Sequence, residues 1–168
     1  MRKDDLAFRK ELVSLLPRLR RFAMALAGQR ELAEDLLQSA VERALRNWGS
    51  FQSGRRLDSW MFKIMQNQWI DMRRADASAP TSSAIEGFDP AGEDGRRIVE
   101  ARDEVRVARA AFEALPEDQR AVLTLVVLED LSYNDAAAAL GVPIGTIMSR
   151  LSRARAAMSS HMQRAALV

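Results

Sequence analysis

The sequence contains no cysteine and a single histidine, His161, and aromatic residues make up only 6% of its 168 residues. Without cysteine the chain has no disulfides, no thiolate metal ligands and no cysteine nucleophile. One histidine supports neither a histidine-rich metal centre nor a serine–histidine–aspartate triad. We therefore expect no metal, no cofactor and no catalytic residue.

Long apolar runs are also lacking. No stretch approaches the roughly 20 apolar residues that cross a bilayer, and the N-terminus lacks the apolar core of a signal peptide. The carboxylates are spread along the chain, and no glycine-rich loop suited to cradling phosphate is present. These absences predict a cytoplasmic protein that has no membrane insertion, no small-molecule substrate and no enzymatic activity.

Apolar residues are plentiful, at 48% of the chain, and their spacing is helical almost throughout. Steps of 4, 3, 4, 3 and 4 separate the first six, which are Phe8, Leu12, Leu15, Leu19, Phe22 and Leu26. Within this series we expect Pro17 to open a second helix and Gly28 to end it. No segment alternates in the manner of a strand, so we predict an all-α fold.

Charge divides the chain into three parts. Residues 1–75 include 15 basic and 9 acidic residues. Residues 76–104 include 3 basic and 8 acidic residues, and residues 105–168 include 7 basic and 6 acidic residues. Proline, glycine, serine and threonine are concentrated in residues 77–95, which predicts a flexible acidic linker. We therefore expect two small helical domains, residues 1–76 and 96–168, on either side of it.

The C-terminal part contains the pattern of a helix-turn-helix. Ser132 and Asp135 resemble a capping box before a short helix over residues 133–140, which Gly141 ends. Pro143 then suits the first turn of a second helix. One apolar face of this second helix is expected to dock on the domain, and it consists of Ile144, Ile147, Leu151, Ala154 and Met158.

The neighbouring face of that second helix collects Thr146, Ser149, Arg150 and Arg153. An arginine side chain can donate two hydrogen bonds to guanine, and short hydroxyl side chains can contact phosphates or base edges. This face of the helix therefore suits binding in the major groove. Alternatively, these arginines only solvate a surface helix. The tight turn and the absence of acidic residues after Asp135 favour the DNA-reading interpretation.

The N-terminal part contains a helix that Asp58 or Ser59 is expected to cap, that runs to about residue 74 and that combines aromatic and polar groups. Trp60 lies on the same side as Lys63, Asn67 and Arg74. A stacking ring beside cations and an amide can hold unstacked bases, which suits single-stranded nucleic acid. Trp60 as a core residue is the competing interpretation, and the loop Gly54, Arg55 and Arg56 before the helix makes the two interpretations equally good.

A third surface is acidic. Glu31, Asp35, Gln38 and Glu42 recur at steps of 4, 3 and 4 opposite the apolar stripe of their helix. Such a stripe is usually a solvated face, and a protein-docking role is the alternative.

Three segments together resemble the extracytoplasmic-function (ECF) sigma factors of bacterial RNA polymerase. The promoter-melting domain of that family is similar to AEDLLQSAVERALRNW (residues 33–48) and SWMFKIMQNQWIDMRR (residues 59–74). The second DNA-binding domain is similar to residues 115–155, above all to their end, GTIMSRLSRAR. The resemblance implies a subunit that binds core RNA polymerase and promoter DNA, opens the DNA and is commonly held inactive by an anti-sigma factor.

The resemblance also assigns residues. It implies that Asp35, Gln38 and Glu42 dock on the polymerase clamp, and that Thr146, Ser149, Arg150 and Arg153 read the −35 element. The loop over residues 50–58 corresponds to one that pockets a flipped base of the −10 element, although its sequence departs from the usual FRGD-like string. The set expected to bind and melt the −10 element is Ser53, Arg55, Arg56, Trp60, Lys63, Asn67 and Arg74.

Three other interpretations compete with this one. An autonomous helix-turn-helix regulator binds duplex DNA without polymerase, whereas a sigma-like decoy binds an anti-sigma factor but not DNA. The retention of Arg150, Arg153 and the aromatic helix argues against a decoy. An enzyme has no supporting constellation of residues.

Overall fold

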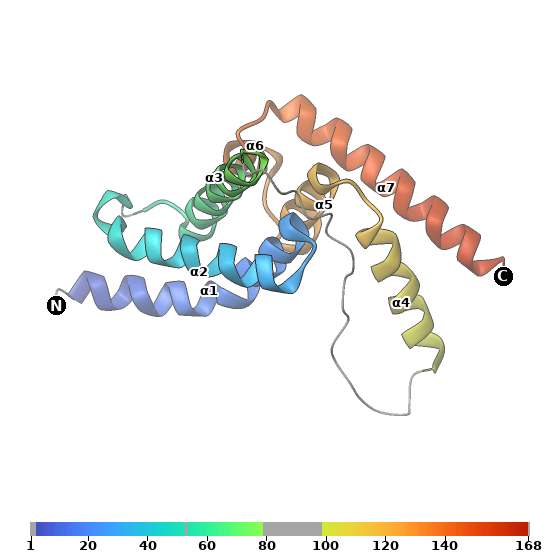
Figure 1. Cartoon of the computed structure of the whole chain (residues 1–168), viewed down its shortest axis with the longest axis horizontal. Helices are drawn as coiled ribbons and strands as arrows, with labels where there is room; N and C mark the ends of the chain where they lie inside the picture. Colours follow the sequence, from blue (N-terminus) through green and yellow to red (C-terminus); the bar gives the residue numbers. More distant parts are fainter. Residues whose placement is uncertain (1–2, 53, 79–98, 168) are drawn as a thin grey trace.

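The computed structural model describes residues 3–52, 54–78 and 99–167, and every regular element among them is helical, which confirms the all-α prediction (Figure 1). The N-terminal helices lie side by side, α6 lies beside α3, and α7 runs outward to the C-terminus. The elements are α1 (Lys3–Ala27), α2 (Arg30–Arg46), the short 3-10 helix η1 (Trp48–Ser50), α3 (Leu57–Ala77), α4 (Val99–Glu113), α5 (Glu117–Leu123), the π-helical turn η2 (Thr124–Leu128), α6 (Tyr133–Leu140) and α7 (Ile144–Ala166).

Helix α1 is continuous through Pro17, so the prediction that Pro17 opens a second helix is wrong. A proline in a helix removes the hydrogen bond to the carbonyl four residues earlier, here that of Val13. Both Val13 and Pro17 are exposed, so water can hydrate that carbonyl and the helix continues. The helix ends as expected, because Gly28 adopts a φ of 69° and donates its N–H to the Met24 carbonyl.

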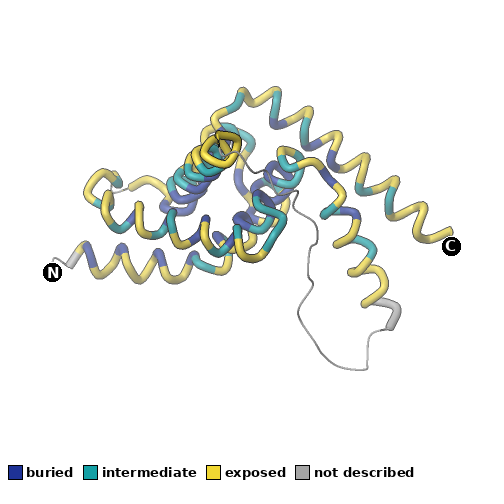
Figure 2. The backbone as a smooth tube through the Cα atoms, viewed as in Figure 1, coloured by how far each residue is buried: buried dark blue, intermediate teal, exposed yellow. Residues whose placement is uncertain are grey.

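The hydrophobic core draws on both halves of the chain (Figure 2). Phe22 of α1 and Phe62 of α3 are fully buried and meet edge to face, with ring centroids 5.2 Å apart. Val122 and Leu125, from α5 and η2, are fully buried in the same cluster. Because each such side chain contributes about 1.5–3 kcal/mol on burial, the two predicted domains stabilise one another in this arrangement.

The start of α3 differs from the prediction, which gave Asp58 or Ser59 as its N-cap. The helix begins at Leu57, with Arg56 at the N-cap position and no side-chain cap. The Asp58 carboxylate instead accepts the N–H of Ser59 and hydrogen bonds from Arg56. Since α3 continues to Ala77, it also takes in the first residue of the predicted linker, whose residues 79–95 lie outside the described part of the chain.

The helix-turn-helix forms as the sequence predicted. The Ser132 hydroxyl oxygen accepts the N–H of Asp135 at 3.0 Å, and Gly141 ends α6 with a φ of 66°. Helix α7 then follows Pro143. On its docking face Ile147, Leu151 and Ala154 are buried and Met158 is partly buried, but Ile144 is 42% exposed, so its predicted docking is wrong. Ile144 is the first residue of α7, so no preceding turn of that helix lies beneath its side chain.

None of the described helices has the length and apolar character required to cross a bilayer.

Candidate nucleic-acid and polymerase interfaces

The second helix of the helix-turn-helix, α7, presents its predicted DNA-reading residues away from the core. Ser149 and Arg153 are exposed, and Thr146 and Arg150 are half-buried. Ile147 and Leu151, between them in sequence, are buried and fix the rotation of the helix. The four residues therefore share a side of α7 that remains open to solvent.

Two of these side chains have intramolecular partners. Arg150 Nε lies 3.1 Å from a carboxylate oxygen of Asp118, at the start of α5, and the Ser149 hydroxyl donates to the Thr146 carbonyl. Within the described ranges no carboxylate pairs with Arg153. Arg153 is thus available to a phosphate or a base at once, whereas Arg150 must first leave Asp118.

The loop before α3 is held by an aromatic cluster. The Trp60 ring lies 5.3 Å from that of Phe51 and 6.2 Å from that of Phe8, measured between centroids. Trp60 is half-buried, so it is a core residue on one side and accessible on the other. Both interpretations of Trp60 therefore describe part of its environment. Gly54 has a φ of 97°, which turns the loop there.

The remaining −10 candidates follow the same edge. Arg55 and Arg56 are exposed in the loop, and Lys63, Asn67 and Arg74 are exposed along α3. Ser53 lies outside the described residues. The structure thus places a half-accessible ring next to a solvent-facing line of two cations and an amide, the groups that suit an unstacked strand.

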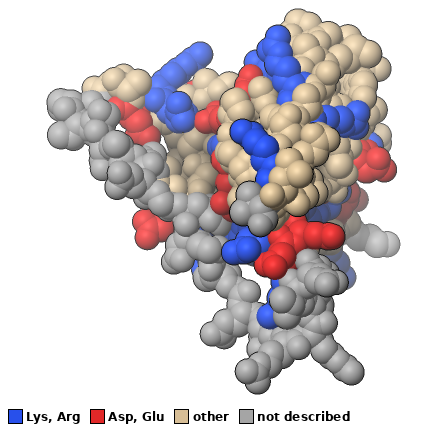
Figure 3. Space-filling model, turned by 90° about the vertical axis from the view of Figure 1, so that its right-hand side faces the viewer, with Lys and Arg blue, Asp and Glu red and all other residues tan. Residues whose placement is uncertain are grey.

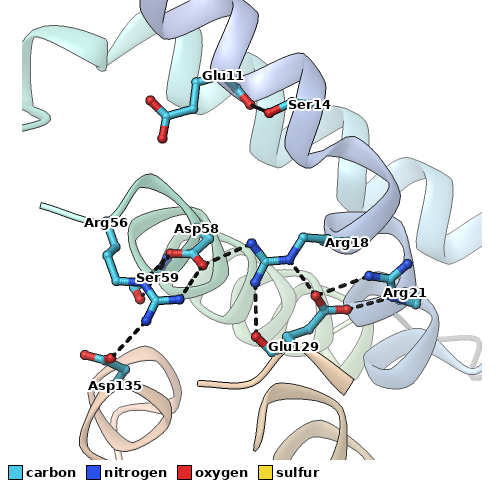
Figure 4. Close-up of polar contacts among 9 residues, drawn as sticks. All are labelled: Glu11, Ser14, Arg18, Arg21, Arg56, Asp58, Ser59, Glu129 and Asp135. Atoms are coloured by element: carbon cyan, nitrogen blue, oxygen red, sulfur yellow. Dashed lines mark hydrogen bonds and ion pairs between the residues drawn. The ribbon is translucent and has the colours of Figure 1, made fainter. Parts of the chain in front are cut away.

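A chain of charged groups connects this loop to the C-terminal half (Figure 4). Arg56 lies 2.8 Å from Asp58 and 3.7 Å from Asp135 of α6, while Arg18 Nη1 lies 3.1 Å from Asp58. Burial opposes ionisation of Asp58, but hydrogen bonds from Arg56, the Ser59 N–H and Arg18 outweigh it and lower the pKa of this carboxyl. Conversely, the hydrogen bond that Arg56 donates to Asp58 raises the pKa of Arg56.

The acidic face of α2 points to solvent. Asp35, Gln38 and Glu42 are all exposed. Gln38 donates to Glu42 at 3.2 Å, and Arg46 lies 3.4 Å from the same carboxylate. These contacts within one helix leave the face open to a protein partner.

Sequence reasoning missed the polar contacts that join the two halves. Buried Glu129 accepts hydrogen bonds of 2.7 Å from Nε of both Arg18 and Arg21, which also raises the pKa of Arg21. Glu117 accepts the Trp69 indole N–H at 2.8 Å and a hydrogen bond from Arg73 at 3.1 Å. The one local signal was the pair Glu129 and Asp130, two carboxylates near the end of a mostly apolar run over residues 121–131.

Positive charge is dispersed on one face of the molecule, the one that Figure 3 shows. On the face shown in Figure 3, Lys and Arg side chains form separate groups among uncharged residues, and Asp and Glu side chains lie close to several of them. Among the described residues, no group of three or more His, Asp or Glu side chains is placed to hold a metal ion. On the face shown in Figure 3, charge dispersed in this way supplies little of the long-range attraction that drives non-specific DNA binding.

Comparison with known families identifies both halves. Residues 12–79 match Sigma-70 region 2, and residues 106–158 match Sigma-70, region 4. The ECF RNA polymerase sigma factor EcfG of Rhodopseudomonas palustris (strain TIE-1) is 37% identical over 155 residues, which is 92% of this chain and 84% of that protein. The ECF RNA polymerase sigma-E factor of Escherichia coli (strain K12) is 31% identical over 77% of this chain and 73% of its own length.

A solved structure is similar over nearly the whole chain. It is that of the sigma factor RpoE in complex with the anti-sigma factor NepR from Bartonella quintana. It matches with a TM-score of 0.71 and 32% sequence identity, covering 94% of this chain and 97% of that one. At this identity and coverage the likeness extends to both halves of the fold.

Proposed function

This chain belongs to the ECF RNA polymerase sigma factors of the sigma-70 family, and we propose on that premise that it directs core polymerase to two promoter elements. The observation that carries the proposal is the solvent-facing side of α7. There, Thr146, Ser149, Arg150 and Arg153 stand beside a buried apolar face, as a helix that reads the −35 element in the major groove requires.

The −10 element is assigned to the loop before α3 and to the exposed edge of that helix. Arg55, Arg56, Lys63 and Arg74 supply positive charge for the strand backbone, and Asn67 supplies an amide for a base edge. The accessible side of Trp60 supplies a stacking surface, and Ser53 joins this set by its position in the loop. Capturing an extruded base offsets the few kcal/mol of unstacking, so melting needs no hydrolysis.

Core polymerase is assigned to the acidic face of α2. Asp35, Gln38 and Glu42 are exposed there and, among the described residues, make no polar side-chain contacts beyond their own helix. A negative patch of this kind docks on a basic partner surface and steers the encounter.

The two halves act as separate DNA readers in this proposal, with residues 1–76 at the −10 element and residues 96–168 at the −35 element. Linked weak readers bind with far higher avidity than either alone when a scaffold sets their spacing. In the closed arrangement, in which the two halves contact each other as in this structure, Arg56 pairs with Asp135 across the halves; Arg150 pairs with Asp118 within the C-terminal half. Both pairs must exchange for DNA contacts, so the free protein is expected to bind promoter DNA weakly.

An anti-sigma factor is the further partner that we assign, and the cytoplasm is the location. The similar Bartonella quintana structure is a complex with the anti-sigma factor NepR, and its sigma factor matches this chain over both halves. A protein that holds the two halves together would keep Arg56 in its pair with Asp135, which joins them.

Run-off transcription with purified core polymerase on a promoter library tests the function directly, together with gel shifts in the presence and absence of polymerase. We expect promoter-dependent transcripts, and promoter complexes only when polymerase is present. A gel shift of comparable affinity without polymerase would favour an autonomous helix-turn-helix regulator. Failure of the purified chain to bind polymerase at all would refute the proposal.

A further inference from the structure

A pocket of about 530 Å³ lies where α1, α4 and the end of α5 meet. Its apolar lining includes Met24 of α1, Phe112 of α4 and Leu128 of η2, and its polar lining includes Arg120 and Thr124. Its volume falls within the range of small-molecule sites, which combine apolar walls with a few polar groups. None of the functions assigned above uses this pocket.

One polar group in the lining lacks a partner. Thr124 is 1% exposed, and among the described residues nothing hydrogen-bonds to its side-chain oxygen Oγ1. Buried hydroxyls are nearly always satisfied, so this one needs an explanation. Thr124 also begins the π-helical turn η2, a feature that is frequent at functional sites.

The second polar group, Arg120, lies one helical turn before Thr124 and therefore on the same face of the helix. Its Nε donates to the Ala25 carbonyl at 2.8 Å and its Nη1 to the Leu115 carbonyl at 2.6 Å, and both acceptors are uncharged. Nη2 takes part in neither bond and lies near Gly28. Burial is the main cause that lowers the pKa of Arg120, which indicates that its positive charge is incompletely compensated.

Arg120 also differs from the other cations of the lining in its ion pairing. Arg20, Arg21, Arg109 and Arg120 all line the pocket, against a single acidic lining residue, Glu113. Arg20 pairs with Glu34, Arg109 with Glu113 and Arg21 with Glu129. Among the described residues no carboxylate forms an ion pair with Arg120, so this guanidinium is the uncompensated charge of the lining. An anionic group is the complement to such a lining.

We propose that this pocket binds an amphiphilic carboxylate, a molecule with an apolar body and one carboxylate. The body packs against Met24, Phe112 and Leu128, and the carboxylate accepts an Nη2–H of Arg120. Rotation of the Thr124 side chain about χ1 brings its buried hydroxyl to the same carboxylate. Because the lining comes from both halves of the chain, occupancy favours the closed arrangement. Binding itself is independent of promoter recognition, so a chain that failed to join polymerase would still bind the ligand.

Isothermal titration of the full chain with decanoate, kept below its micelle concentration, tests the proposal, and decan-1-ol serves as the uncharged probe. We expect saturable binding of one decanoate per chain, and binding of decan-1-ol at least about tenfold weaker because it lacks the charge. Equal affinity for the two probes would overturn the proposal. So would the absence of saturable decanoate binding, the result expected if the pocket accommodates a side chain of a partner protein.

Variants locate the site. Thr124→Val keeps the shape and removes the hydroxyl, and is expected to weaken decanoate binding about tenfold. Met24→Trp fills the pocket and is expected to abolish binding. The matched control is Val127→Ala, because Val127 lies in η2 but outside the lining. Circular dichroism establishes that each variant is folded. An equal loss of affinity in Val127→Ala and Thr124→Val would contradict the assignment.

Discussion

Arg18 Nε donates a 2.7 Å hydrogen bond to Oε2 of Glu129, a residue 111 positions later in the chain. The Glu129 side chain is 1% exposed and also accepts a 2.7 Å bond from Arg21. A buried carboxylate between two guanidiniums from another helix fixes how the halves meet. The same contact links to the −10 loop, because Arg18 also pairs with Asp58.

Removal of the Glu129 carboxylate is expected to destabilise the closed fold. Glu129→Ala removes the buried carboxylate that Arg18 and Arg21 share and leaves Arg18 paired with Asp58 alone, and breaking buried pairs costs about 3–5 kcal/mol. Since the Arg21 side chain is 50% exposed and that of Arg18 is 28% exposed, we expect a loss at the lower end of this range. Urea unfolding should show a free energy of unfolding that is lower by about 3 kcal/mol. The control is Glu34→Ala, which removes an equally short but exposed bond from Arg20 and is expected to cost less than about 1 kcal/mol. An equal loss of unfolding free energy in the two variants would show that burial of the carboxylate does not determine how much its ion pairs stabilise the fold.

Arg153→Ala is expected to reduce transcription from a cognate promoter about tenfold, because a base or phosphate contact is worth about 1–3 kcal/mol. Binding to core polymerase should be unchanged, which a pull-down or fluorescence titration measures. Arg155→Ala is the matched control, since Arg155 is another exposed arginine of α7 but points to a different side. A similar defect in both variants, or a loss of polymerase binding, argues against the assigned reading face.

Reversal of charge on α2 is expected to weaken polymerase binding. Asp35→Arg places a cation on a face proposed to meet a basic surface, and we expect affinity for core polymerase to fall at least tenfold. Glu11→Arg makes the same charge change on the exposed side of α1 and should have little effect. Fluorescence anisotropy with labelled protein measures both. Unchanged affinity in Asp35→Arg would remove this face from the interface.

Acid is expected to weaken the contact around Asp58. Its folded pKa is depressed below the ordinary 3.8, so the stabilisation is fully present above 3.8 and is lost as pH falls through the folded value. Urea unfolding should therefore show stability dropping with pH below 3.8, and the drop should be shallower in Asp58→Asn. Asp71→Asn, at a carboxylate 58% exposed on the same helix, is the comparison. If both variants lose stability with falling pH as steeply as the wild-type protein does, Asp58 does not contribute to this pH dependence.

Two glycines of the helix-turn-helix are expected to respond oppositely to alanine. Gly141 has a φ of 66°, so Gly141→Ala forces a side chain into the left-handed region and should cost about 1 kcal/mol. Gly145 lies within α7, and a Cβ added there would meet no neighbouring atom within 4 Å, so Gly145→Ala should stabilise by about 0.5–1 kcal/mol. Thermal unfolding measures both. A loss in Gly145→Ala equal to that in Gly141→Ala would show that backbone conformation is not the cause.

Local rules predicted the features that depend on near neighbours in sequence. The cap at Ser132, the left-handed Gly141 and the buried Ile147 and Leu151 all follow from spacings of three or four residues. Local rules failed at Pro17, where solvent exposure of the affected carbonyl decided the outcome. They failed again at Asp58, because Arg18 and Arg56 draw its carboxylate away from the cap position.

The sequence by itself determined that the chain is helical, that it carries a helix-turn-helix and which polar faces its helices present, because helix periodicity and capping act over a single turn. Only the tertiary structure decided that the two halves share one core, that Glu129 lies between Arg18 and Arg21, and that Thr124 and Arg120 line one pocket. Contacts between residues about a hundred positions apart depend on how whole helices pack. A local sequence pattern therefore does not predict which two distant charged residues will be buried next to each other.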